Sequence, residues 1–119
     1  MLAEDNKINQ IVASELLNLM KVKLTVANNG IEAVDAVKKR DFDLILMDIQ
    51  MPEMDGLTAT QVIRHLDKPG VDKIPILAMT ANAMDTDYQK SLEVGMNDHL
   101  TKPIDPDKLR LALEKWIVR

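Results

Sequence analysis

The chain has no cysteine among its 119 residues and no long hydrophobic run. Disulfide bonds, thiolate metal sites and cysteine nucleophiles are therefore excluded, and the composition fits a reducing compartment. No apolar stretch approaches the roughly 20 residues that a membrane-spanning helix needs, and the first residues lack a basic segment ahead of an apolar one. We expect a cytoplasmic domain without direct membrane insertion.

Aromatic residues and excess positive charge are also scarce. The chain has one Trp, one Tyr and one Phe, and its 15 Lys and Arg residues are outnumbered by 19 Asp and Glu residues, which gives a net charge of -4. Direct binding of nucleic acid needs a basic surface and stacking aromatics, so we expect none. The length suits one compact core, and we expect residues 1–119 to form a single domain.

Short apolar segments alternate with segments of helical spacing along the whole chain. The first apolar segment is shorter than a usual strand, so we expect the chain to begin inside that strand. Five repeats of strand then helix predict an α/β fold, with parallel strands and helices on both faces of the sheet. The predicted strands are residues 1–3, 24–27, 44–48, 74–79 and 98–101.

Each predicted helix has an apolar stripe and recognisable ends. Asp5 or Asn6 would cap the first helix, Gly95 would end the fourth, and Asp105-Pro106 would begin the fifth. The stripe of the first helix is predicted to face the core. Its members are Ile8, Ile11, Val12, Leu16, Leu19 and Met20.

The residues at the carboxyl ends of the predicted strands share a chemistry. Glu4-Asp5 follow the first strand, Asp48 ends the third, Thr80 follows the fourth and Lys102 follows the fifth. Parallel strands end at one edge, so these side chains should converge there. Neighbouring carboxylates repel unless a divalent cation lies among them, and a set of oxygen ligands favours Mg²⁺.

Each of these residues also has an ordinary structural interpretation. Asp48 could begin a strand-to-helix turn, Glu4-Asp5 could cap a helix, and Lys102 could be a surface amine. Taken together they indicate phosphoryl chemistry, because an Asp carboxylate can form an aspartyl-phosphate while Mg²⁺ and Lys neutralise the transferring oxygens. Asp48 is the predicted nucleophile because its strand is central.

Four segments carry a resemblance to a known family. They are Glu4-Asp5-Asn6, DLILMDIQMPEMDG at residues 43–56, IPILAMTANA at 74–83 and GMNDHLTKPI at 95–104. Together they resemble the receiver domain of two-component response regulators over essentially the whole chain. EDNxxNQ, MDIQMPEMDG and GMNDHLTKPI are particularly similar to receivers attached to hybrid sensor histidine kinases. The resemblance implies a flavodoxin-like, doubly wound sheet of order 2-1-3-4-5.

The resemblance also implies roles for the acidic residues. Asp48 would accept phosphoryl from the phosphohistidine of a histidine kinase or a histidine phosphotransfer protein. Asp5 would bind Mg²⁺ directly and Glu4 through water, while Asp48 and the backbone carbonyl of Gln50 would complete the protein ligands. Such a domain is a phosphoacceptor in signal transduction and not a turnover enzyme. It would lie in the cytoplasm, including the cytoplasmic part of a membrane-bound hybrid kinase.

Further residues would sense the phosphoryl group. By resemblance, Thr80 would hydrogen-bond it, Lys102 would pair with it, and a cis peptide before Pro103 would aim Lys102 into the site. His99 stands where the family usually has a switch aromatic, so it is either a half-buried edge-strand histidine or part of the switch. A downstream effector would bind the face of the fourth helix, fifth strand and fifth helix. His65 is expected to be a solvated surface residue.

Three other functions are weighed against this one. An aspartyl-phosphate phosphatase commonly has a second Asp two residues after the nucleophile, where this chain has Gln50. A flavin-binding electron carrier would need a Gly/Ser/Thr-rich loop after the first strand, where this chain has EDNKIN, and aromatics to stack the ring. A degenerate receiver that serves only for docking would lack site residues that are present here.

Overall fold

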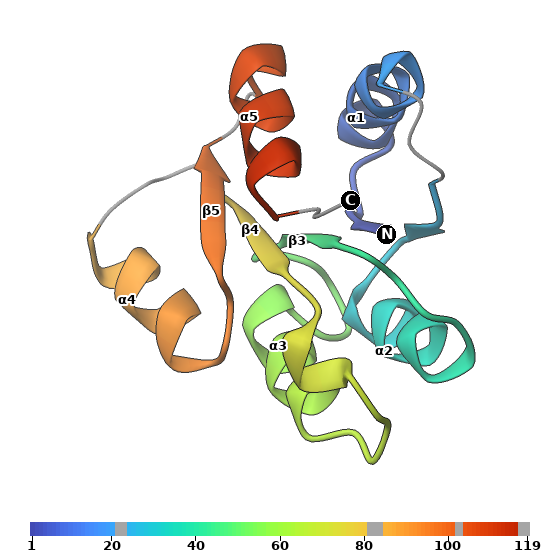
Figure 1. Cartoon of the computed structure of the whole chain (residues 1–119), viewed down its shortest axis with the longest axis vertical. Coiled ribbons are helices and arrows are strands. Elements are labelled where there is room, and N and C mark those ends of the chain that lie inside the picture. The colour runs from blue at the N-terminus through green and yellow to red at the C-terminus, as the bar shows by residue number, and fades with distance from the viewer. Residues whose placement is uncertain (21–23, 81–84, 102–103, 117–119) are drawn as a thin grey trace.

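The computed structural model describes residues 1–20, 24–80, 85–101 and 104–116. These residues form a five-stranded parallel sheet of order β2-β1-β3-β4-β5 (Figure 1), which confirms the predicted topology. The elements in chain order are β1 (Leu2–Ala3), α1 (Lys7–Leu19), β2 (Val26–Ala27), α2 (Gly30–Lys39), β3 (Ile45–Asp48), α3 (Gly56–Arg64), η1 (Val71–Lys73), β4 (Ile76–Thr80), α4 (Asp85–Glu93), β5 (Asp98–Thr101) and α5 (Pro106–Trp116).

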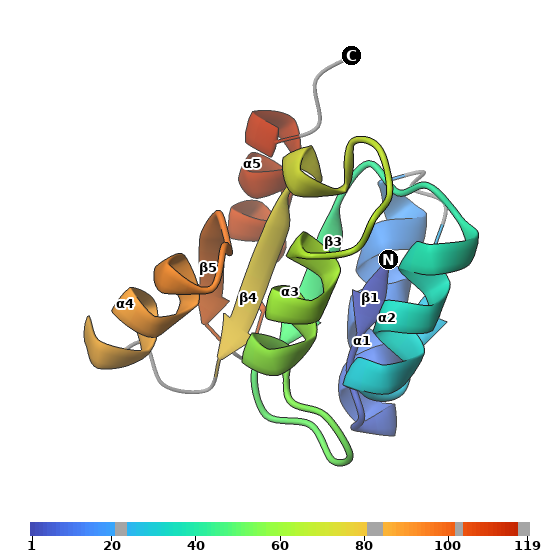
Figure 2. The same cartoon turned by 90° about the horizontal axis from the view of Figure 1, so that it is seen from below.

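Two helical layers enclose the central strands. In Figures 1 and 2, α1 and α5 lie on one face of the sheet, and α2 and α3 lie on the other. Successive side chains of β3 enter opposite layers: Ile45 and Met47 join the cluster under α2 and α3, and Leu46 joins the cluster under α1 and α5. An unbroken apolar run is what a strand covered on both faces requires.

Helix α1 turns a different face to the sheet from the predicted one. Its buried residues are Gln10, Ala13 and Leu17, while Leu16 and Met20 pack at the margin. The prediction is wrong for most of the stripe, because four of its members are exposed. They are Ile8 at 72%, Ile11 at 58%, Val12 at 47% and Leu19 at 81%.

The start of α1 explains this rotation. Asn6 caps the helix by accepting from the N–H groups of Ile8 and Asn9 at 2.9 and 3.2 Å, only two residues beyond the buried Glu4. So short a connection leaves the helix little freedom to rotate. The Gln10 amide is thereby placed against the Glu4 carbonyl, to which it donates.

The apolar stripes expected from the sequence for the other helices are Val34 and Val37, then Leu57, Thr60, Ile63 and Leu66, then Met84, Tyr88, Leu92 and Val94, and last Leu109, Leu113, Trp116 and Ile117. Val34 and Val37 of α2, Ile63 of α3 and Leu109 and Leu113 of α5 are buried. In α4 the outcome is mixed, because Leu92 is 45% exposed and Val94, just beyond the helix, packs against the core. Met84, Tyr88 and Ile117 lie outside the residues whose side chains are described.

Helix ends also agree with the sequence. Gly95 follows α4 with φ of 104°, a left-handed conformation that glycine adopts without strain. Asp105 precedes α5 and accepts from the Asp107 N–H at 2.8 Å. None of the described helices is both long and apolar enough to cross a membrane.

The orientation of α1 leads to a paired test of stability. Leu17 is 2% exposed and Leu19 is 81% exposed on the same helix. We expect Leu17→Ala to lower the free energy of unfolding by about 2–5 kcal/mol through a cavity, and Leu19→Ala to lower it by less than about 0.5 kcal/mol. Urea denaturation of both variants provides the measurement. A larger loss of unfolding free energy in Leu19→Ala than in Leu17→Ala would indicate that α1 buries the face predicted from the sequence.

Candidate functional site

The strand register brings the predicted residues to one end of the sheet. Asp48 is the last residue of β3 and pairs with Met79, so Thr80 extends one residue further along β4. Glu4 follows β1 directly, and its N–H donates to the Ala27 carbonyl of β2 at 2.9 Å. The predicted convergence of Glu4, Asp48 and Thr80 on the carboxyl edge is therefore present, and all three are buried.

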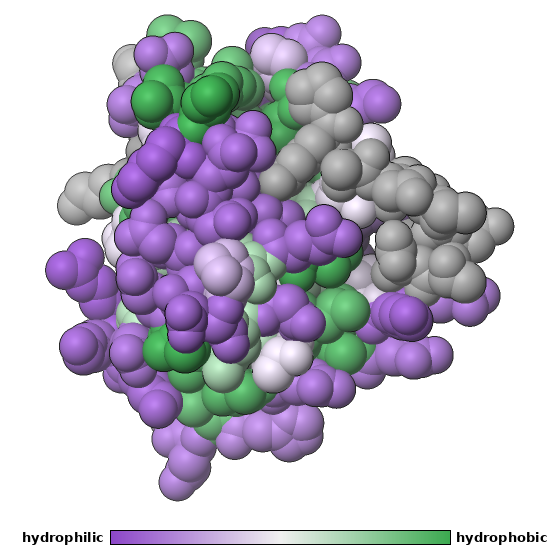
Figure 3. Space-filling model, turned by 180° about the vertical axis from the view of Figure 1, so that it is seen from behind, coloured by the Kyte–Doolittle hydropathy of each residue, from purple (hydrophilic) through white to green (hydrophobic). Residues whose placement is uncertain are grey.

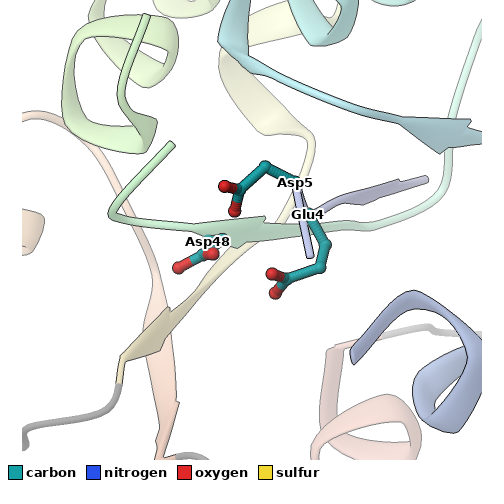
Figure 4. Close-up of side chains that lie close together, drawn as sticks. All are labelled: Glu4, Asp5 and Asp48. Atoms are coloured by element: carbon teal, nitrogen blue, oxygen red, sulfur yellow. The ribbon is translucent and has the colours of Figure 1, made fainter. Parts of the chain in front are cut away.

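Three carboxylates meet at this edge. Glu4, Asp5 and Asp48 each offer a carboxylate oxygen, and these oxygens lie within 4.8 Å of one another. Figure 4 shows that Glu4 and Asp5 come from the segment after β1 and Asp48 from the end of β3, with their carboxylates pointing into one space. Glu4 is 2% and Asp48 4% exposed, while Asp5 is exposed to solvent.

Backbone and amide groups hold the buried carboxylates. Glu4 Oε1 accepts from the Asn6 N–H at 3.2 Å and from Asn9 Nδ2 at 3.4 Å. Asp48 Oδ1 accepts from the Gln50 N–H at 3.3 Å. These donors orient the two side chains without adding a formal charge.

The segment between β3 and α3 packs closely behind Asp48. The Gly56 N–H donates to the Ile49 carbonyl at 2.9 Å, and a Cβ at Gly56 would lie 2.1 Å from the Asp48 carbonyl oxygen. Only glycine fits there, because the obstacle is backbone. An open depression of about 550 Å³ beside the cluster is lined by Asp5, Ile49, Gln50, Met51, Pro52 and Asp55.

The donor set suits a hard cation. Carboxylates this close repel one another, whereas each of them would be attracted to a divalent ion bound between them. Oxygen ligands without sulfur or imidazole nitrogen match the preference of Mg²⁺. Figure 3 views the molecule from the side where the strands end, and its centre is largely hydrophilic. The exposed Asp5 and the open depression leave the acidic cluster accessible to a metal ion.

The remaining predicted residues have different outcomes. His99 is half-buried on β5, which forms an edge of the sheet, and its backbone N–H donates to Asp98 Oδ1 at 2.9 Å. Lys102 and Pro103 lie outside the described residues, so the predicted cis peptide does too. His65 is exposed, as predicted, with Nδ1 2.7 Å from the Gln61 carbonyl oxygen.

Gln10 and Asn28 are two polar residues around the site whose part in it was not predicted. Gln10 of α1 is 8% exposed, and its Nε2 donates to the Glu4 carbonyl and to Asn28 Oδ1. A glutamine inside a helix normally indicates a solvent-facing position, so periodicity gave no signal. The EDNxxNQ segment did include this residue, but only as part of a resemblance.

The chain is similar to known proteins over almost its whole length. The model of the response regulator receiver domain family matches residues 1–114, and the chain belongs to this family. Receiver domains of this family are phosphoacceptors in two-component signalling rather than classical enzymes. The predicted family, fold and domain function are thus confirmed.

Similar sequences occur within histidine kinases. The chain is 46% identical over 124 residues to hybrid signal transduction histidine kinase B of Dictyostelium discoideum, covering 97% of this chain and 6% of that protein. It is 40% identical over 114 residues to the sensor protein GacS of Pseudomonas syringae pv. syringae, covering 95% and 13%. The chain therefore spans only a small part of these relatives.

Two solved structures are also similar. One is the receiver domain of a Pseudomonas aeruginosa sensor histidine kinase with a magnesium ion coordinated in its active-site cleft, at 39% identity and a TM-score of 0.89, covering 98% of this chain and 93% of that one. The other is the receiver domain of the Saccharomyces cerevisiae response regulator Ssk1, co-crystallised with the histidine phosphotransfer protein Ypd1. It has 32% identity and a TM-score of 0.88, with coverage of 98% and 86%.

Proposed function

We propose that Asp48 is the phosphoacceptor of this receiver domain and takes its phosphoryl group from a phosphohistidine. The observation that carries this is the position of Asp48 at the end of a central strand, with oxygens of Glu4 and Asp5 within 4.8 Å. In the transfer, an Asp48 oxygen attacks phosphorus, a P–O bond forms, the P–N bond breaks, and the imidazole leaves with the bonding electrons. The product is an aspartyl-phosphate.

The acidic cluster is proposed to hold Mg²⁺. Asp5 would bind the ion directly, Glu4 through water, and Asp48 and the Gln50 carbonyl would complete the protein ligands. The exposure of Asp5 supports a direct contact, and the two donors on Glu4 Oε1 support an indirect one. Bound there, Mg²⁺ would supply positive charge against the phosphoryl oxygens.

Thr80 and Lys102 are proposed to read the phosphoryl group, with a cis peptide before Pro103 aiming Lys102. Thr80 is buried at the end of β4, next to β5, where His99 lies. β5 is joined to α5 by a hydrogen bond from Trp116 Nε1 to Asp98 Oδ2 at 3.1 Å. This link supports an effector surface formed by α4, β5 and α5, with His99 as a candidate part of the switch.

A histidine kinase or a histidine phosphotransfer protein is proposed as the donor, and α1 offers it a surface. The donor must bring an imidazole to Asp48, so it has to contact the edge of the site. Ile8, Ile11 and Val12 are exposed on α1, which begins two residues after Asp5. Figure 3 shows hydrophobic surface at the upper left, over α1, bordering the hydrophilic centre. An apolar face of this kind suits a helical partner.

We further infer that residues 1–119 act as one receiver domain, in the cytoplasm or in the cytoplasmic part of a hybrid kinase. The family model covers nearly the whole chain, and similar segments occur inside much longer histidine kinases. Gln50, at the position where a phosphatase would have its second Asp, supports a signalling acceptor over a turnover enzyme.

The acceptor assignment is tested by phosphorylation with acetyl phosphate. We expect intact mass spectrometry to show one phosphoryl adduct that requires Mg²⁺ and is absent in Asp48→Asn, which removes the attacking carboxylate. Asp35→Asn, the same substitution at an exposed position of α2, should retain the adduct. An adduct that persists in Asp48→Asn would place the acceptor elsewhere.

The metal ligands are tested by calorimetric titration with Mg²⁺. Asp5→Ala removes a proposed direct ligand, whereas Glu4→Ala removes a contact through water. We therefore expect the dissociation constant to rise more in Asp5→Ala than in Glu4→Ala, and both variants to be phosphorylated more slowly. Wild-type affinity in both variants would contradict a shared acidic metal site.

The role of Thr80 is tested by hydrogen exchange with and without a beryllofluoride mimic of the phosphoryl group. Only interactions that differ between two states can shift their populations, so Thr80→Ala should bind the mimic with little change in α4 and β5. Wild type and Thr58→Ala, altered at an exposed position of α3, should both show the change. An equal response in Thr80→Ala would mean that the signal uses another route.

A further inference from the structure

The turn at residues 28–30, between β2 and α2, contacts both loops that carry the proposed metal ligands. On one side Asn28 Oδ1 accepts from Gln10 Nε2 at 2.9 Å, and the same nitrogen donates to the Glu4 carbonyl. On the other side the Gly30 N–H donates to the Met54 carbonyl at 3.0 Å. A Cβ at Gly30 would lie 2.3 Å from that oxygen, so turn and loop meet at backbone contact.

The amide of Gln10 has no spare donor in this arrangement. Nε2 carries two hydrogens, and it has two acceptors, the Glu4 carbonyl and Asn28 Oδ1. With Gln10 only 8% exposed, losing either acceptor would leave a polar group poorly satisfied. The side chain therefore has one favourable orientation.

Glu32 and Lys7 both determine which way the Asn28 amide faces, and Lys7 Nζ donates to Asn28 Oδ1 at 3.4 Å. Glu32 Oε1 accepts from Asn28 Nδ2 at 3.0 Å and from the Asn28 backbone N–H at 3.1 Å. A carboxylate accepts only, so Nδ2 must face Glu32 and Oδ1 must face Gln10. Gln10 thus donates both to the Glu4 carbonyl and to Asn28, and Asn28 donates in turn to Glu32.

That carbonyl belongs to the peptide bond between Glu4 and Asp5. Asp5 is exposed, so packing does little to fix its side chain, and its direction depends on the backbone on either side. The Asn6 cap fixes the following residue, and Gln10 fixes the preceding peptide plane. The network therefore acts on the residue for which direct metal contact is proposed.

We propose that Gln10 is a positioning residue for the metal site, oriented by Asn28 and Glu32; this inference rests on the proposed function. Gln10 does not touch the metal. It sets the Glu4–Asp5 peptide so that the Asp5 carboxylate faces Asp48, in the way that outer partners orient metal ligands. The contact of Gly30 with Met54 fixes the same turn relative to the loop that carries Gln50.

The first test replaces the donor and keeps the volume. Gln10→Met is close in shape but cannot donate, and we expect it to raise the Mg²⁺ dissociation constant about tenfold, the lower end of what outer partners usually contribute. Gln61→Met, at an exposed position of α3, should bind as wild type does. Calorimetric titration with Mg²⁺ alone gives the affinities.

Urea denaturation without metal, run in parallel, separates positioning from stability. A purely structural role would lower the unfolding midpoint and leave the affinity of the folded protein unchanged. Unchanged Mg²⁺ affinity in Gln10→Met would therefore overturn the inference, whatever its midpoint.

The second test exchanges the partners that orient Asn28. Asn28→Asp sets a carboxylate oxygen against Glu32 and should weaken Mg²⁺ binding, although its added negative charge alone would favour the cation. Adding Glu32→Gln places a hydrogen-bond donor opposite the new oxygen and also restores the wild-type net charge. The double variant should therefore recover the wild-type affinity for Mg²⁺. Wild-type or tighter binding by Asn28→Asp would overturn the inference, even if Gln10→Met failed to fold.

Asp5→Ala separates failure of this inference from failure of the proposed function. If wild type does not bind Mg²⁺, or if Asp5→Ala binds as tightly as wild type, the metal site itself is wrong and the inference is overturned with it. If Asp5→Ala weakens binding while the Gln10 and Asn28 variants do not, the metal site stands and only the positioning role is overturned.

Discussion

The close approach of three carboxylates is the constraint around which this site is arranged. Oxygens of Glu4, Asp5 and Asp48 lie within 4.8 Å of one another, and two of these side chains are buried. Burial of like charges is unfavourable unless other groups compensate, so the surrounding structure must hold the acids in place. A parallel sheet can hold the acids in place because the carboxyl ends of its strands lie along the same side. Helices on both faces cover the strands themselves.

Close backbone contacts and helix caps hold the loops of the acidic edge. Gly56 lies against the Asp48 carbonyl and Gly30 against the Met54 carbonyl, and neither position has room for a Cβ. Asn6, Asn29 and Asp55 cap the helices that follow β1, β2 and β3. Each loop at the acidic edge is thus held at a strand on one side and at a capped helix on the other. A site that must tolerate repulsion before metal arrives needs such preorganisation.

Much of this was predictable from sequence for identifiable reasons. The run Leu44–Met47 is too short for a helix and apolar throughout, so it specifies a buried strand. Asp48 directly after it marks the carboxyl end of that strand. Alternation of strands and helices then fixes parallel strands. The order 2-1-3-4-5 came from the resemblance instead, because alternation alone does not choose among doubly wound orders. Asp48 as the nucleophile was inferred from the residues themselves, whereas the finer roles of the other site residues came from that resemblance; all of these roles stay predictions.

The buried face of α1 was predicted wrongly because tertiary contacts, and not hydrophobic periodicity, determine it. Periodicity weighs only hydrophobicity, and the stripe through Ile8 and Ile11 is more apolar than the face through Gln10, Ala13 and Leu17. The Asn6 cap and the hydrogen bonds of Gln10 decide the rotation, and neither contributes to an apolar pattern. A glutamine inside and isoleucines outside is unfavourable for stability alone.

Departures from local rules of this kind tend to occur where function requires them. On the inward face of α1, Gln10 reaches the Glu4 carbonyl and, in our proposal, orients the metal ligand beside it. Turned outward, its apolar face borders the site at which a phosphodonor must arrive. One rotation of one helix would thus serve both the proposed metal site and the proposed surface for the phosphodonor, which neither face would do if the predicted stripe were buried.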